Sequence, residues 1–474
     1  MDEFATLDGI AQAALVQRGE ITALELVETA VRRIEATNPQ LNAIVTEMFD
    51  QAQTADQTNP NVSPLSGVPF LLKDLGIAYK GVRLTGGSAA LANFVPTTNA
   101  TLVERANAAG LIALGKTNTP EFGLLPTTEP TFLGTCRNPW DIGRSPGGSS
   151  GGAAAAVAAG MVPVAHASDG GGSIRIPAAC CGLFGLKPTR GRVPAGPSNG
   201  DVMSGLSTSG CVSRSVRDSA AFLDIISGPS AGDPYWAPPQ QRPFLAETTT
   251  PPGQLRIGFS TVAPSGVKID EACVTAVRHT AQLCANLGHH VEEAVPVFDA
   301  TRFNDAFLAL WAAGCAWTVK GIGLLTRQPP NPAQYEPLTW AMYEQGERLT
   351  AADYLLAVQS LQLISRQIAS FFDRYDLWLT PVVAEPPLLL GQFDPQPGNP
   401  LSGMERAIAF VPFTPIANAT GQPAMSLPLH WTESGLPVGV HFMGRFGDEA
   451  TLFRLAAQLE EAQPWAQRTP PVFA

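Results

Sequence analysis

The length and charge of the chain already exclude several classes of protein. Its 474 residues carry a net charge of −11, and only 15% of them are Asp, Glu, Lys or Arg, so no basic patch is available to displace counterions from nucleic acid. Seven cysteines without a C-x-x-C pair and six histidines without ligand spacing argue against a metal site. The composition therefore predicts a globular protein without a cofactor, a metal or a nucleic-acid partner.

The first ten residues, MDEFATLDGI, are acidic and resemble no signal peptide. An apolar stretch at residues 153–165 is too short to span a membrane. Scattered cysteines are typical of a reducing compartment. We therefore expect a cytoplasmic protein that makes no use of a membrane.

Residues 1–60 are predicted to form N-terminal helices. Thr22 and Glu25 have the spacing of a capping box, in which each side chain accepts from a free backbone N–H at the start of a helix. Apolar residues then recur at helical spacing. Asn38-Pro39 is predicted to end this helix.

Residues 61–230 alternate between short apolar strands and helices, which predicts an α/β fold with a mixed central sheet covered by helices on both faces. The strand at 68–72 leads into Lys73. Asn99 is expected to cap a helix that stops at Gly110, and Ser215 with Asp218 to form a second capping box. Further elements are expected at residues 111–114, 152–159 and 162–165.

The remaining residues continue the same domain. An exposed connection at 228–254 precedes a strand at 255–260 and a helix at 270–287, and later strands are expected at 377–380, 425–429 and 438–442. Residues 300–375 read as a helical insertion broken by prolines at 329–337. We predict one domain over residues 1–474, with the insertion shaping a substrate pocket.

Lys73 follows an apolar strand, and burial disfavours the charged form of a lysine. A lysine that is neutral near pH 7 can act as a general base. The alternative is a surface lysine at the end of a strand.

Two glycine-rich stretches present serines. Ser149 lies in SPGGSSGG at residues 145–152, directly before an alanine-rich helix, which argues against a flexible linker. Ser173 follows three glycines in DGGGSIRIP at 169–177. Converging backbone N–H groups there can stabilise a developing oxyanion. An anion-binding nest or a simple turn are the alternatives.

Together, Lys73, Ser149 and Ser173 resemble the amidase signature family, which carries a Lys, a Gly-Gly-Ser-Ser-Gly-Gly stretch and a Gly-Gly-Ser-aliphatic-Arg motif about two dozen residues later. The resemblance extends through most of the chain, at residues 67–69, 115–121, 137–140, 185–192, 421–424 and 435–439. It implies an amide hydrolase that works through an acyl-enzyme.

The resemblance also implies roles. Ser173 would be the nucleophile, Ser149 a proton relay with a cis peptide bond, and Lys73 the base. An oxyanion hole would be formed by the backbone N–H groups of Gly170, Gly171, Gly172 and Ser173. Ser150 would support the catalytic residues by hydrogen bonds, and Asp169 and Arg175 would hold the loop that carries Ser173. The family often has threonine where this chain has Gly170, so a hydroxyl is missing beside the oxyanion hole and substrate preference is in doubt.

Two other motifs mislead. Residues 147–151 match the G-x-S-x-G elbow of α/β-hydrolases, but no buried strand precedes them, and His430 and His441 are more plausibly structural. Residues 110–117 match a phosphate-binding loop, yet the four residues between the glycines are apolar and should form a buried strand.

Within the family, residues 127–130, 143–145, 163–166 and 423–428 resemble hydrolases of 6-aminohexanoate cyclic dimer. This implies a small amide substrate, cyclic or linear, with specificity from residues 302–345 and 385–412 and with Cys315 facing the pocket. A buried small hydrophobe is an equal alternative for Cys315. A general amidase, an A-type subunit of a tRNA-dependent amidotransferase and a non-catalytic binding protein stay open as alternatives. Such enzymes are commonly homodimers.

Overall fold

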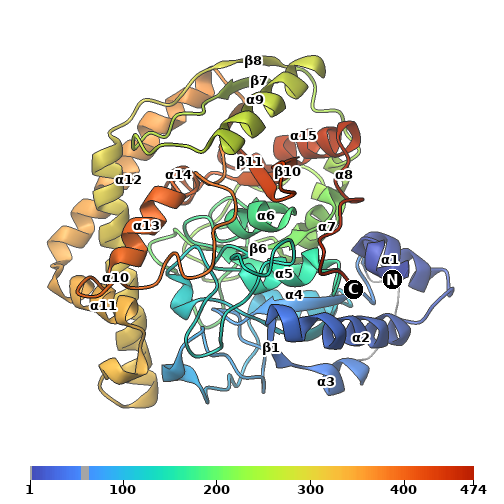
Figure 1. Ribbon diagram of the computed structural model, residues 1–474, viewed down its shortest axis with the longest axis horizontal. Coiled ribbons are helices and arrows are strands. Elements are labelled where there is room, and N and C mark those ends of the chain that lie inside the picture. Colours follow the sequence, from blue (N-terminus) through green and yellow to red (C-terminus); the bar gives the residue numbers. More distant parts are fainter. Residues whose placement is uncertain (1–2, 55–62) are drawn as a thin grey trace.

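The computed structural model describes residues 3–54 and 63–474. Residues 1–2 and 55–62, which include both ends of the predicted helical segment 1–60 and the start of the predicted core, lie outside the described residues. In the described part, eleven strands form one mixed sheet in the order β1-β3-β2-β4-β6-β5-β10-β11-β9-β7-β8. The predicted architecture is confirmed, with helices on both faces of this sheet (Figure 1).

The strands that matter for the site lie near one end of the sheet. β2 runs parallel to β3 and to β4, with Phe70 opposite Val164, while β4 pairs antiparallel with β6. The strand bounds are β1 Ile44–Glu47, β2 Pro69–Lys73, β3 Ile112–Thr117, β4 Val164–Asp169, β5 Phe184–Lys187, β6 Thr208–Ser213, β7 Arg256–Phe259, β8 His290–Glu293, β9 Leu377–Pro381, β10 Ala424–Trp431 and β11 Pro437–Gly444.

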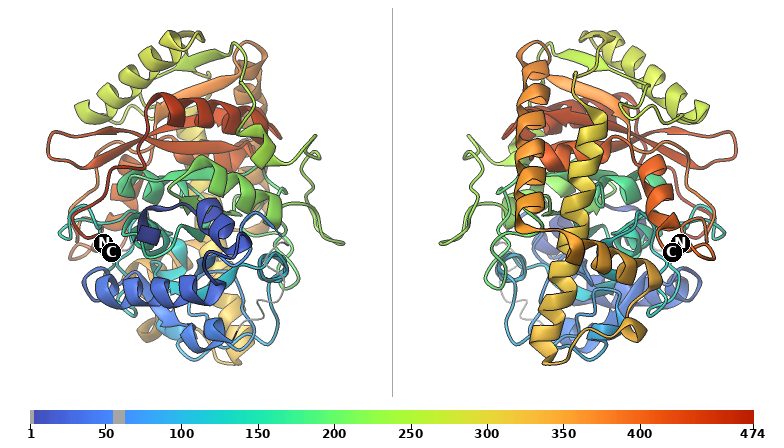
Figure 2. Two further views of the ribbon diagram at one scale, coloured as in Figure 1. Left: turned by 90° about the vertical axis from the view of Figure 1, so that its right-hand side faces the viewer. Right: turned by 90° about the vertical axis from the view of Figure 1, so that its left-hand side faces the viewer.

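Helices cover the sheet in two layers, and a third group stands at one side. The helix bounds are α1 Gly9–Gln17, α2 Ala23–Leu41, α3 Phe49–Gln53, α4 Thr101–Ala108, α5 Gly151–Ala158, α6 Arg175–Cys181, α7 Val216–Ile226, α8 Phe244–Glu247, α9 Glu271–Asn286, α10 Ala300–Thr326, α11 Pro337–Arg348, α12 Ala351–Ala369, α13 Ser402–Phe410, α14 Thr414–Thr420 and α15 Glu449–Ala462. α10, α11 and α12 form the side group, and the two termini lie close together (Figure 2).

The core has two main halves because side chains alternate across the strands. On β2, Phe70 and Leu72 pack with α4, α7, α9 and α15 on one face. Leu71 between them points the other way and packs with α2, α5 and α6. The strand is buried on both faces, as expected for its continuous apolar run.

Three predictions about helix ends and helix caps differ from the structure. α2 continues through Pro39 to Leu41 and ends on Asn42 in the left-handed conformation, because a proline in the last turn removes only one helical hydrogen bond. Asn99 does not cap α4; its side chain accepts from the Lys80 N–H instead. The Ser215 hydroxyl does cap α7, but the Asp218 carboxylate accepts from the N–H groups at the start of α1, so the second box is half formed.

Helix α10 is long and apolar enough to cross a membrane, judged by length and composition alone, and it is the one such helix among the described residues. In the fold it packs against α11 and α12, and 39% of its most apolar window is buried. Phe303, Ala306 and Leu310 of α10 join the core that also includes residues of α12 and α14. The apolar residues of α10 therefore contribute to the core of the fold.

Candidate active site

Two parallel strands end side by side and bring the first groups of the site together. β2 ends at Lys73 and its neighbour β4 ends at Asp169. Because parallel strands finish at the same edge of a sheet, Lys73 lies beside the last residues of β4. Its Nζ is 3.1 Å from the Ser168 Oγ.

Ser149 reaches the same point from the turn before α5. Its Oγ lies 2.7 Å from the Lys73 Nζ, and the Gly148–Ser149 peptide bond is cis, as the resemblance implied. Residue 148 must be glycine, since a Cβ there would lie 2.2 Å from the Thr127 backbone oxygen. The neighbouring Ser150 Oγ accepts from the Ser168 N–H at 3.3 Å, which ties the serine turn to β4.

The Lys73 side chain is completely buried, and burial lowers its pKa to about 7, against an opposing effect of the Asp169 charge. His166 lies behind it: the Lys73 backbone N–H donates to the His166 Nδ1 at 3.3 Å. Burial, reinforced by the charge of Lys73, lowers the pKa of His166 well below its usual range, so this ring is neutral. A lysine in this setting can take up and return a proton near neutral pH.

Asp169 and Arg175 hold the loop that carries Ser173. The two side chains form a buried ion pair of 3.0 Å. Although burial acts to raise the pKa of Asp169, the charge and hydrogen bonds of Arg175 lower it well below the usual range. Asn418 also donates to the Asp169 carboxylate at 2.9 Å, and His441 contacts Arg175 at 2.9 Å. The loop is thus fixed from behind by a fully buried polar network.

That network corrects the predicted oxyanion hole. The Gly172 N–H donates to the Asp169 Oδ1 at 2.7 Å, so this group is already occupied. Within the described chain, the N–H groups of Gly170, Gly171 and Ser173 have no protein acceptor. These three remain the candidate donors to an oxyanion.

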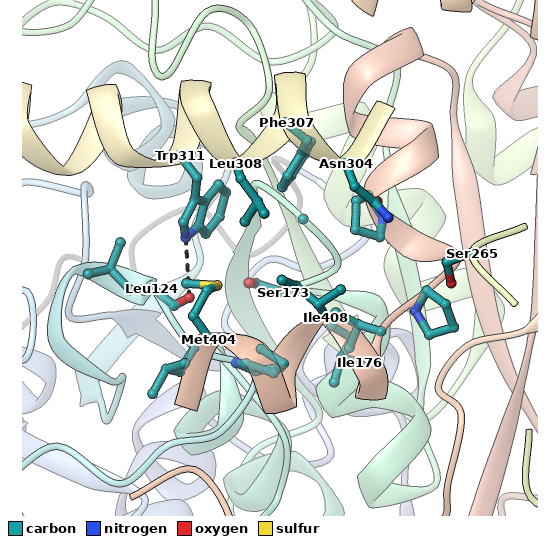
Figure 3. Close-up of a pocket in the computed structure, with 18 of the residues that line it drawn as sticks. Leu124, Ser173, Ile176, Ser265, Asn304, Phe307, Leu308, Trp311, Met404 and Ile408 are labelled. Atoms are coloured by element: carbon teal, nitrogen blue, oxygen red, sulfur yellow. Dashed lines mark hydrogen bonds between the residues drawn. The ribbon is translucent and has the colours of Figure 1, made fainter. Parts of the chain in front are cut away.

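Ser173 stands where two chambers meet. The apolar chamber lies between α10 and α13 and is lined by residues that include Phe307, Leu308, Trp311, Met404 and Ile408 (Figure 3). The second chamber carries more polar groups than the first and is called the polar chamber. Its lining includes Ser149, Ser168, Asn199, Ser207 and Ser209 beside apolar residues such as Phe122, Val193 and Trp317. The chambers enclose about 740 and 1180 Å³ of empty space, partly open to solvent, which suits a small molecule.

The Ser173 hydroxyl faces the chambers, and the described residues offer it no hydrogen-bond partner (Figure 3). Ser149 borders the polar chamber with it, without a hydrogen bond between the two hydroxyls. Catalytic hydrogen bonds are often long before substrate binds and tighten in the complex. The arrangement can therefore present one free hydroxyl to a substrate, with a serine and a neutral lysine behind it.

The glycine at position 170 has a local explanation. A Cβ at Gly170 would lie 3.4 Å from the Trp311 ring, already in van der Waals contact. The indole is itself fixed, because its Nε1–H donates to the Leu124 backbone oxygen at 3.3 Å (Figure 3). The Trp311 ring thus stands beside position 170, and an aromatic surface borders the loop where the family often has a threonine hydroxyl.

Cys315 does not line either chamber, so that prediction is wrong. It is 1% exposed and its thiol donates to the Thr339 backbone oxygen of α11 at 3.5 Å. Residues 304, 307, 308 and 311 of α10 face the apolar chamber, whereas position 315 lies one turn further on, where α11 covers the helix. The alternative of a buried small hydrophobe holds.

The misleading motifs resolve as expected. Gly115 and Lys116 lie inside β3, which covers residues 112–117, so the matching segment forms a strand and no phosphate loop. His441 is buried behind Arg175, and His430 is half-buried on β10, where its ring lies 6.5 Å from that of His279. Neither histidine lines the two chambers.

The sequence analysis missed several site residues. Ser168 directly precedes Asp169, and strand alternation could have placed it beside Lys73. Asn418 lies 249 residues from Asp169, and its asparagine alone gives no signal of that contact. Met404 and Ile408 have helical spacing, which a core helix shows equally well.

Comparison with known proteins agrees with this geometry. The family model described as "Amidase" matches residues 25–453. The chain belongs to the amidase signature family. Two relatives named 6-aminohexanoate-cyclic-dimer hydrolase, from Pseudomonas sp. (strain NK87) and Paenarthrobacter ureafaciens, are each 38% identical over 98% of this chain and 96% of their own length.

A solved structure of 6-aminohexanoate cyclic dimer hydrolase complexed with substrate has a TM-score of 0.95 and 36% identity, covering 99% of this chain and 100% of the other. As an amidase signature protein, this chain is a hydrolase of carbon–nitrogen bonds. The identity of its substrate is a separate question.

Proposed function

We propose that this amidase hydrolyses uncharged small amides through an acyl-enzyme on Ser173, with 6-aminohexanoate cyclic dimer as the leading candidate substrate. The observation that carries the catalytic part is the contact of a fully buried lysine with a serine at the mouth of a chamber. Lys73 lies 2.7 Å from Ser149, and its pKa is lowered by burial to about 7. A lysine with its ordinary pKa would be charged and could not act as a base there.

The reaction has two halves. The Ser173 Oγ attacks the amide carbon, its proton passes to the Ser149 Oγ, and the proton of Ser149 passes to the neutral Lys73 Nζ. The oxyanion accepts from the free N–H groups of residues 170, 171 and 173. As the carbon–nitrogen bond breaks, the nitrogen takes a proton back from Lys73 through Ser149, and the amine leaves.

Water completes the cycle by the reverse route. It attacks the ester carbon of the acyl-enzyme and gives its proton to Lys73 through Ser149. The bond to the Ser173 Oγ then breaks, and this oxygen recovers its proton. A carboxylic acid leaves, and the enzyme returns to its starting state.

The linings of the two chambers indicate an uncharged substrate. Among the described residues that border them, none has a charged side chain. A carboxylate or ammonium group that enters would lose its hydration without gaining an ionic partner, which is unfavourable. A cyclic 6-aminohexanoate dimer has no free terminus, whereas the linear dimer and glutamine carry both charges. The chambers therefore favour the cyclic compound.

The same observation weighs against an amidotransferase subunit, which must bind glutamine. A general amidase for another neutral amide stays compatible with the chambers. Two relatives at 38% identity are 6-aminohexanoate-cyclic-dimer hydrolases by name, which favours the cyclic dimer over other neutral amides.

The test compares wild type with Ser173→Ala on four substrates: the cyclic dimer, the linear dimer, hexanamide and glutamine, with products followed by mass spectrometry. We expect wild type to cleave the neutral amides at least tenfold faster than the charged ones, and the variant to cleave none. Full activity of Ser173→Ala would overturn the mechanism. Preferred cleavage of glutamine would overturn the substrate class.

A further inference from the structure

The two chambers share Ser173 but differ in access to the proton relay. Ser173, Gly123 and Trp311 border both chambers. Ser149 and Ser168, the two hydroxyls in contact with the Lys73 Nζ, border the polar chamber alone. An amide bound at Ser173 therefore has its proton donor on one side only.

This asymmetry fixes the direction in which a substrate binds. The nitrogen of the breaking bond must take up a proton to leave, and that proton comes from the side of Ser149. We propose that the amine part of the substrate occupies the polar chamber and the acyl part the apolar chamber, so that the enzyme takes an apolar acyl group joined to a polar, uncharged amine. This proposal rests on the proposed function, because it takes Ser173 and Ser149 in their assigned roles.

The apolar chamber is built for a hydrocarbon chain. Phe303, Phe307 and Trp311 stack along one face of α10, with ring centroids 5.9 and 5.5 Å apart. Of these, Phe307 and Trp311 lie opposite Met404 and Ile408 of α13 (Figure 3). The chamber also holds Asn304 and Ser265, but a polar acyl group placed between the rings and the α13 side chains would lose hydrogen bonds to water without replacement there.

The polar chamber has a hydroxyl prepared to donate. Because the His166 Nδ1 accepts from the Lys73 N–H, the proton of the neutral ring is on Nε2. The Nε2 lies 3.3 Å from the Ser209 Oγ, so the histidine donates and Ser209 accepts. The O–H of Ser209 is then free to donate to a ligand. Ser209 borders the polar chamber, and it lies opposite Ser168 where β4 pairs with β6.

Ser209 is therefore a specificity residue for the amine part. Its hydroxyl donates to a hydrogen-bond acceptor in the amine part of the substrate, such as a carbonyl oxygen. One hydrogen bond of this kind changes kcat/KM by about fivefold.

A pair of isomers with the central amide reversed tests the direction. N-hexanoylglycinamide has an apolar acyl part and a polar amine part, whereas N-pentylmalonamide has the opposite order and the same formula. Release of glycinamide and of pentylamine by wild type is measured by mass spectrometry. We expect glycinamide release to be at least tenfold faster; equal rates or faster pentylamine release would overturn the assignment of the chambers.

Ser209→Ala tests the specificity residue, with Ser370→Ala as the control, since Ser370 is exposed and borders neither chamber. We expect Ser209→Ala to lower kcat/KM about fivefold for N-hexanoylglycinamide and to leave phenyl hexanoate unchanged, because this ester has the same acyl group and a leaving group with no acceptor beyond the ester oxygen. The control should change neither. Equal loss on both substrates, or on neither, would overturn the role of Ser209.

Labelling of Ser173 by a fluorophosphonate distinguishes a failure of the proposed function from a failure of the chamber assignment. Absence of labelling and of ester hydrolysis contradicts the proposed function itself. Labelling and ester hydrolysis without cleavage of either isomer contradicts only the assignment of the chambers.

Discussion

Replacing Lys73 by methionine should abolish activity and yet make the protein more stable. The structure places this lysine in full burial, where its pKa falls from an ordinary 10.5 to about 7. A shift of this size corresponds to a folding penalty of about 5 kcal/mol when the side chain is charged. Methionine has a similar length and no charge, so Lys73→Met removes the penalty. It also leaves Ser149 and Ser168 without their partner, at a cost of about 2 kcal/mol.

The pH dependence separates these two effects. Below pH 7, Lys73 is protonated in both the folded and the unfolded chain, so the full penalty is present. Between pH 7 and 10.5 only the unfolded chain holds the proton, so the penalty falls steadily with rising pH across this range and is gone above the unfolded pKa of 10.5. The loss of the serine contacts does not follow this titration. We expect the variant to be about 3 kcal/mol more stable than wild type at pH 6 and about equal at pH 9.

Urea unfolding followed by tryptophan fluorescence at the two pH values measures this difference. Lys320→Met is the control, because Lys320 is exposed and its pKa is not lowered, so its effect should not change between pH 6 and pH 9. If Lys73→Met is destabilised by the same amount at both values, the lysine is not desolvated and the reasoning is refuted. An active variant would refute the role of Lys73 as base.

Three further predictions concern the catalytic lysine, the buried ion pair behind the Ser173 loop, and Cys315. The kcat/KM of wild type should rise about tenfold from pH 6 to pH 8, because Lys73 must be neutral to accept a proton and its pKa is about 7; a flat profile would contradict this. Asp169→Asn should lower the free energy of unfolding by about 4 kcal/mol in urea titrations, since it leaves Arg175 buried without its counter-ion; a loss under 1 kcal/mol would show that the pair is dispensable. Cys315→Ala should keep kcat/KM within about twofold while lowering stability by about 1 kcal/mol, and a tenfold fall in kcat/KM would return this residue to the pocket.

The sequence was sufficient where short-range chemistry decides the structure. Thr22 and Glu25 form the predicted capping box because both partners lie within one turn. The apolar run before Lys73 was predicted as a buried strand and is one, although a surface position for the lysine itself was excluded only by the structure. The glycines around Ser149 and Ser173 mark turns that larger residues cannot adopt, as the contact between position 148 and Thr127 shows.

The tertiary structure alone decided which way side chains face and what stands behind them. Cys315 follows the chamber-lining face of α10 by one turn, and only the placement of α11 shows that it is covered. The Gly172 N–H was predicted as an oxyanion donor, but in the fold it donates to the Asp169 carboxylate instead. Asn418 reaches that carboxylate across 249 residues of chain. Local patterns fix helices, strands and turns because their partners are close in sequence, whereas chambers and buried networks join distant segments whose meeting depends on the packing of the whole fold.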